Sequence, residues 1–227
     1  MARLTRLVIP GLPYHVTQRG NRRQQTFFND GDYALYRELI AAAARRSECA
    51  IWAYCLMPNP VHLIVVPSHC DLRQLFADAH RRYTGFINAR QRWTGHVWQG
   101  RFGAVAMDEA HLAAAARYVA LNPVRARSCE RAEQWPWSSA RAHLAGADDA
   151  LTTVAPLLDR YGDFASFLGG AEDQQATRAL RTAETTGRPL GSGAWLADLE
   201  AASGRALAPK KPGPKPRSET GGVRCIQ

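Results

Sequence analysis

The feature that most constrains this fold is a pair of β-branched and aromatic runs, at residues 50–57 and 61–66, separated by a Pro-Asn-Pro turn. Such a turn between two such runs predicts neighbouring antiparallel strands. Side chains alternate along a strand, which puts His62 on the same face as residues 64 and 66. His62 is therefore expected to be one polar residue on an otherwise apolar sheet face. A lone histidine there is most often a simple strand-end residue, so its role depends on the rest of the chain.

Segments on either side of this hairpin extend the pattern. Residues 12–19 alternate in polarity and run into a Gly-Asn pair, so they are predicted to form a first strand. Two amphipathic helices are predicted, one capped by Asp30 or Asp32 and the other by Asp71. Residues 95–107 are predicted to be extended. The resulting βαββαβ order is typical of the ferredoxin-like α+β fold, whose antiparallel sheet carries two helices on one face and leaves the other face free.

A further helix is predicted from His111 to Leu121, with Asp108 as its cap and an Asn-Pro pair at its end. Its apolar residues form one packing stripe, while Tyr118 and Asn122, four residues apart, share a different face. The small alanines around Tyr118 leave room for its side chain to reach outward. On this pattern alone, a tyrosine at a domain edge with its hydroxyl in water is commoner than a catalytic one.

Composition divides the chain into three parts. Residues 1–145 hold the elements described above, and residues 146–206 are predicted to form a mostly helical C-terminal extension. Residues 207–227 contain a Pro-interrupted basic run that cannot build a core, so they are predicted to be a disordered basic tail. Such a tail either lies along a nucleic-acid groove or only keeps the protein soluble.

Charge and apolar content narrow the class of partner. A net charge of +9 predicts a polyanionic partner, nucleic acid before membrane. No apolar run is long enough to span a bilayer and no signal peptide is recognisable, so we expect no membrane partner and a cytoplasmic, nucleoid-associated protein. The five cysteines form no C-x-x-C pair, which argues against a disulfide framework and a structural zinc site.

Five motifs in order resemble the single-tyrosine HUH transposases, and among them the REP-associated tyrosine transposases. They lie at residues 12–23, 54–63, 99–102, 117–126 and 135–139. The resemblance implies that the protein binds hairpin-forming single-stranded DNA, such as REP-like palindromes, and cuts and rejoins it. It also implies that Tyr118 is the nucleophile and forms a 5′-phosphotyrosine intermediate. A phenol is a poor nucleophile at neutral pH, so a divalent ion, Mg²⁺ or Mn²⁺, is expected to assist it.

The chain departs from the family at the metal site. The family pattern has two histidines flanking one apolar residue, whereas this chain has Pro60-Val61-His62. Proline offers no donor atom, so the resemblance leaves His62 and Asn122 as the metal ligands. His15, His69 and the carbonyl of Asn59 are possible substitutes, and nothing in the sequence places any of them beside His62.

Two main hypotheses follow, a metal-assisted DNA strand transferase and a catalytically impaired relative that recognises hairpin DNA without cutting it. A weaker third is an RNA-binding protein, because exposed aromatic residues on ferredoxin-like sheets stack single-stranded bases. Whether the protein is a monomer or a homodimer stays open. Basic side chains are expected to contact DNA phosphates; the candidates are Arg19, Arg22, Arg23, Arg81, Arg82, Arg101, Arg125, Lys210, Lys211, Lys215 and Arg217.

Overall fold

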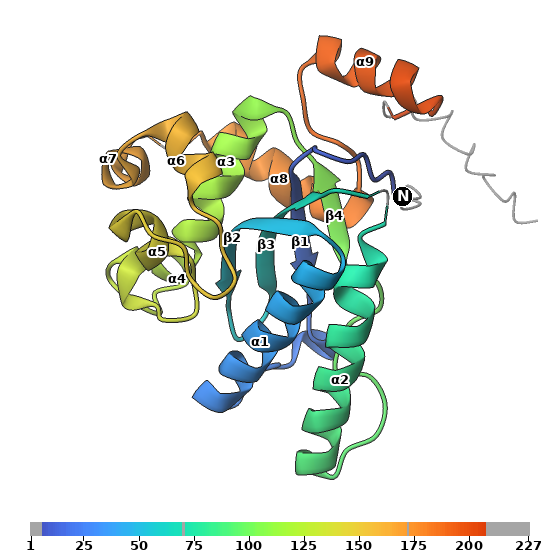
Figure 1. The fold of residues 1–227 in the computed structure, drawn as a ribbon, viewed down its shortest axis with the longest axis vertical. Coiled ribbons are helices and arrows are strands. Elements are labelled where there is room, and N and C mark those ends of the chain that lie inside the picture. Colours follow the sequence, from blue (N-terminus) through green and yellow to red (C-terminus); the bar gives the residue numbers. More distant parts are fainter. Residues whose placement is uncertain (1–5, 70, 172, 208–227) are drawn as a thin grey trace, which may run out of the picture.

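The computed structural model describes residues 6–69, 71–171 and 173–207. Within these residues four strands form one antiparallel sheet in the order β2-β3-β1-β4. The strands are β1 (Tyr14–Gln18), β2 (Cys49–Leu56), β3 (Val61–Pro67) and β4 (Gly103–Ala106). Helices α1 (Asp30–Arg46) and α2 (Arg73–Gln91) lie side by side against one face of this sheet (Figure 1). The α+β, ferredoxin-like fold expected from the sequence is confirmed.

The first face of the sheet carries the larger core. Alternate residues of β1 and β3, such as Val16 and Leu63, point toward α1 and α2 and are fully buried. The helix starts differ in detail from the expectation. Asn29, rather than Asp30 or Asp32, caps α1, because its side chain accepts a hydrogen bond from the Asp32 amide. The Asp32 carboxylate is instead buried in an ion pair with Arg90 near the end of α2.

The expectation that the second face is free is wrong. Helices α3 (Glu109–Ala120) and α8 (Gln174–Thr186) pack there, and their apolar residues form a second core with the strands. The strand residues on this face are small or apolar, among them Ala53, Ile64 and Val105. Left uncovered, they would expose a large apolar patch to water. The alanine-rich stripe of α3 allows this helix to approach the sheet closely.

The C-terminal extension is helical in short pieces, as expected. Its helices are α6 (Ala155–Tyr161), α7 (Phe164–Gly169), α8 and α9 (Gly193–Ser203), and shorter helices precede it: η1 (Asn21–Arg23), α4 (Asn122–Arg125), η2 (Ala132–Gln134) and α5 (Ala140–Ala145). Leu190 fastens the extension to the sheet, because its amide donates to Ala106 at 2.8 Å and its carbonyl accepts from Asp108 at 3.0 Å.

Two expectations concern other parts of the chain. The proposed tail residues Lys210, Lys211, Lys215 and Arg217 lie outside the described residues. Among the residues that are described, no helix has both the length and the apolar character needed to cross a bilayer.

Candidate active site

Two buried histidines meet on the second face of the sheet. His15 lies on β1 and His62 on the neighbouring β3, where Thr17 is the direct partner of His62. The Nε2 atom of His15 lies 3.1 Å from Nδ1 of His62, and the two rings are parallel with centroids 5.3 Å apart. The alternation of residues 60, 62, 64 and 66 predicted the face of His62. It could not predict that His15 lies beside it, because that contact depends on the pairing register of two strands distant in sequence.

Burial keeps both imidazoles neutral. It lowers the pKa of His15 to about 3, and it holds the pKa of His62 well below its usual value, with smaller contributions from His15 and from the charges of Arg19 and Arg181. A neutral imidazole keeps a lone pair on one ring nitrogen, which is the form that binds a metal ion.

Tyr118, on α3, packs edge-on against both histidines. Its ring centroid lies 5.5 Å from that of His62 and 6.0 Å from that of His15. Two guanidinium groups flank the same ring, with Arg125 at 5.1 Å and Arg181 at 5.5 Å from its centroid. Arg125 also donates a hydrogen bond of 3.0 Å to the Tyr118 carbonyl. The phenol therefore lies in a positively charged surrounding that suits a DNA phosphate.

A carboxylate from the C-terminal extension completes this cluster. Glu184, on α8, is buried and accepts a hydrogen bond of 2.9 Å from Arg19. Its other oxygen lies 4.0 Å from Nδ1 of His15, and within the described parts of the chain neither of these two buried atoms has a hydrogen-bond partner. Burial raises the pKa of Glu184, and the charge of Arg19 opposes that shift.

The ligand atoms of His15, His62 and Glu184 lie within 4.8 Å of one another. Two imidazoles and one carboxylate are a donor set that holds divalent ions. Sequence reasoning missed Glu184, because nothing in the pattern of a polar helix distinguishes a buried carboxylate from an exposed one.

His69 and Asn59 are engaged with other partners, and Asn122 lies four residues after Tyr118. Asn122 begins α4 directly after the tyrosine helix, and within the described residues its side chain makes no hydrogen bond to His62 or Tyr118. His69 follows the opposite end of β3 and pairs with Glu48 at 3.1 Å. The Asn59 side chain holds the loop after β1, through the Gly20 amide at 3.2 Å and the Gln24 carbonyl at 2.7 Å.

The predicted DNA-contacting arginines fall into separate groups. Arg19 and Arg125 belong to the histidine and tyrosine cluster described above. Arg22 and Arg23 are exposed on η1. Arg81 and Arg82 lie on α2, which packs on the opposite face of the sheet from Tyr118, and both are near Asp78, at 2.7 and 4.0 Å.

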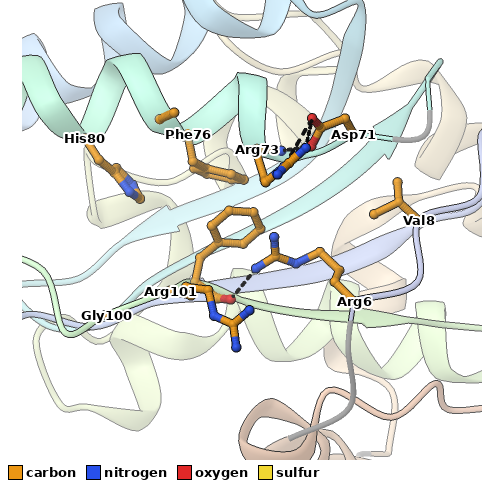
Figure 2. A pocket seen from close by; sticks show the side chains of 10 residues that line it. Arg6, Val8, Asp71, Arg73, Phe76, His80, Gly100 and Arg101 are labelled. Atoms are coloured by element: carbon orange, nitrogen blue, oxygen red, sulfur yellow. Dashed lines mark hydrogen bonds and ion pairs between the residues drawn. The ribbon is translucent and has the colours of Figure 1, made fainter.

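Arg101 lines a cavity of about 510 Å³ between the start of α2 and the segment before β4. Arg6, Arg73 and Arg101 reach this cavity from three separate segments of the chain (Figure 2). The Arg6 guanidinium lies 3.6 Å from the centroid of the Phe102 ring and donates to the Phe102 carbonyl at 2.9 Å. Arg73 is paired with Asp71 at 3.0 Å. Positive charge beside an aromatic ring is a combination that suits nucleotides.

This chain is similar to known proteins in both sequence and fold. Residues 9–122 match the family model described as "Transposase IS200 like". A solved structure of a REP-associated tyrosine transposase bound to a REP hairpin has a TM-score of 0.56 and 22% identity, over 67% of this chain and 92% of that one. A putative transposase from Deinococcus radiodurans R1 has a TM-score of 0.38 and 18% identity, over 52% of this chain and 95% of that one.

A search of curated proteins found no match. The residues that the family model matches include His15, His62, Tyr118 and Asn122, whereas Glu184 lies beyond them. Because the family model matches half of the chain, including Tyr118 and both histidines, this protein belongs to the IS200-like transposases.

Proposed function

We propose that this DNA transposase binds hairpin-forming single-stranded DNA and cuts and rejoins it through Tyr118. The single observation that supports this best is the packing of the Tyr118 ring against His62, with centroids 5.5 Å apart. A tyrosine, a buried neutral imidazole and two guanidinium groups gathered at one point are an unusual combination for a structural core. The similarity to a structure that contains a REP hairpin supports a palindromic DNA as the partner.

In this mechanism the Tyr118 hydroxyl attacks a DNA phosphorus. An oxygen–phosphorus bond forms to the tyrosine, the bond to the 3′ oxygen breaks, the phenol loses its proton and the 3′ oxygen gains one. Attack by the freed 3′-hydroxyl on the phosphotyrosine reverses the step and rejoins the strand. Arg125 and Arg181, which flank the ring, would hold the phosphate in line.

A bound Mg²⁺ or Mn²⁺ would supply charge withdrawal from the scissile phosphate. His62 is the ligand of such an ion that the family pattern implies, and its position beside His15 and Glu184 supports this role. Asn122 is the second ligand that the resemblance implies.

The basic residues outside the cluster are proposed to grip the hairpin. Arg22, Arg23 and Arg101 are exposed, and Arg101 also lines the cavity beside Phe102. Contacts of this kind make DNA affinity fall steeply with salt, because binding releases counterions from the phosphates.

A denaturing gel with hairpin DNA labelled on its 3′ side tests the proposal, because the tyrosine retains that part of the strand. In the presence of Mn²⁺, wild type is expected to form a covalent protein–DNA adduct and Tyr118→Phe is expected to form none. An adduct in Tyr118→Phe would exclude this tyrosine as the nucleophile.

Pro60 favours a second candidate function, a relative that recognises hairpin DNA without cutting it. The same gel separates the two when a Pro60→His variant is included. An adduct in Pro60→His but not in wild type would identify the natural protein as a DNA-binding module, and hairpin affinity unchanged by a chelator would agree with that result.

A further inference from the structure

We propose that His15 and Glu184 complete a divalent metal site with His62, in place of the donor that the family pattern has at position 60. This inference rests on the proposed function, because it names the residues that hold its metal ion. It extends the site from the transposase core to the C-terminal extension, which supplies Glu184 through α8.

His15 lies where it can replace the donor that is missing at residue 60. Residue 60 precedes β3, and the side chain of its proline has no atom that can bind a metal. The neighbouring strand β1 brings His15 to the same face of the sheet, and the direct pairing of Thr17 with His62 places His15 one diagonal step away. A second imidazole therefore lies beside His62, although it comes from a different strand.

The distance between the two imidazole nitrogens fits two ligands of one ion. Two ligands that each lie about 2.1 Å from one ion, at a right angle, are about 3.0 Å apart. The observed separation of 3.1 Å between the two imidazole nitrogens fits this value. When no ion is bound, the same two nitrogens can share a hydrogen bond of this length.

Two buried polar atoms at this site are unsatisfied within the described residues. When His15 donates from Nε2 to His62, its Nδ1 carries a lone pair that faces the carboxylate of Glu184 at 4.0 Å. Neither atom has a hydrogen-bond partner in the described residues, and both are buried. Two acceptors facing each other in a buried place are unfavourable until a cation lies between or beside them. A divalent ion supplies that charge: when Nε2 of His15 binds the ion, the ring proton resides on Nδ1, so that Nδ1 no longer faces the carboxylate as an acceptor.

Packing of α8 holds Glu184 at this place. Leu180 and Ala183, on the same helix, are buried in the second core, which fixes α8 against the sheet. Arg19 binds one carboxylate oxygen and leaves the other for an ion. One carboxylate and two neutral imidazoles leave a divalent ion with net positive charge, which suits a scissile phosphate. Because two of the donors are nitrogens, the set favours Mn²⁺ over Mg²⁺.

Mn²⁺ binding to the full chain carrying Tyr118→Phe tests this site without any DNA chemistry. Isothermal titration calorimetry is expected to show affinity reduced by at least about tenfold in His15→Asn and in Glu184→Gln. His69→Asn is the matched histidine control, because His69 pairs with Glu48 away from this site, and it is expected to bind like the parent. Parent-like affinity in His15→Asn and Glu184→Gln would overturn the proposed site.

Arg19→Gln separates a ligand role of Glu184 from a structural one. This variant removes the ion pair and keeps the carboxylate, so its Mn²⁺ affinity is expected to match that of the parent or exceed it. A loss equal to that of Glu184→Gln would assign the effect to the ion pair and refute the ligand role.

Pulsed electron paramagnetic resonance of bound Mn²⁺ gives an answer that does not depend on affinity or on the stability of a variant. The parent is expected to show coupling to two imidazole nitrogens, and coupling to one or none would contradict the proposal. The adduct gel keeps this result apart from the proposed function. Mn²⁺ binding by all three residues without any covalent adduct would support the metal site and contradict strand cleavage. An adduct that still forms in His15→Asn and Glu184→Gln would support strand cleavage and contradict the metal site.

Discussion

Arg125→Gln is the substitution whose effect on cleavage follows most directly from the structure. Arg125 lies over the Tyr118 ring at 5.1 Å and donates to the Tyr118 carbonyl at 3.0 Å. It thus contacts both the side chain and the backbone of the proposed nucleophile. Glutamine can still donate a hydrogen bond, but it has no charge to place over the ring.

The size of the effect follows from these two contacts. A cation over a tyrosine ring contributes about 0.5–2 kcal/mol, and Tyr118 is only 8% exposed, which favours the upper part of this range. Weakening of the hydrogen bond adds a few tenths of a kcal/mol, because its net contribution is about 1 kcal/mol and glutamine replaces part of it. A total of about 1–2 kcal/mol corresponds to cleavage slowed by about 5–30-fold.

Single-turnover cleavage at saturating hairpin DNA is the appropriate assay, because changes in DNA affinity then do not enter the rate. Arg125→Lys keeps the charge and is expected to fall between wild type and Arg125→Gln. Arg82→Gln, on the opposite side of the sheet, is the matched control and is expected to cleave like wild type. A rate for Arg125→Gln equal to that of wild type would refute the idea that this guanidinium positions the tyrosine.

Three further outcomes are expected. Leu180→Ala removes a buried side chain between α8 and the sheet, so the free energy of unfolding measured in urea should fall by about 2–5 kcal/mol. Mn²⁺ affinity should fall as well, because α8 carries Glu184. Unchanged affinity despite the lost stability would contradict the dependence of the metal site on the docking of α8. Arg101→Gln should weaken hairpin binding, measured by fluorescence anisotropy, and reduce the slope of log Kd against log salt concentration by about one unit. Cleavage at saturating DNA should not slow. An unchanged salt slope would place Arg101 outside the DNA interface. Asp32→Ala leaves the partly exposed Arg90 and the Phe28 amide without their partner, so the free energy of unfolding should fall by about 2–3 kcal/mol. An unchanged urea midpoint would show that the ion pair of Asp32 and Arg90 adds nothing to stability.

Local patterns in the sequence determined much of the architecture. The alternation in residues 50–66 predicted the hairpin and the face of His62, and the alanine-rich stripe with Asp108 as its cap predicted the helix that carries Tyr118. Such features depend on neighbours a few residues apart, so they can be read without a tertiary structure. The same reasoning chose the wrong cap for α1, because Asn29, Asp30 and Asp32 are all good caps and packing against Arg90 decided between them.

Only the tertiary structure decided what surrounds His62. The contact with His15 requires the register between β1 and β3, and the contact with Glu184 requires the docking of α8 on a face that was expected to be free. Both depend on the burial of apolar residues distant in the chain, a cooperative quantity that no short pattern encodes. By itself the sequence therefore determined a ferredoxin-like transposase core with a tyrosine helix, whereas long-range packing determined which donor atoms stand beside its one remaining family histidine.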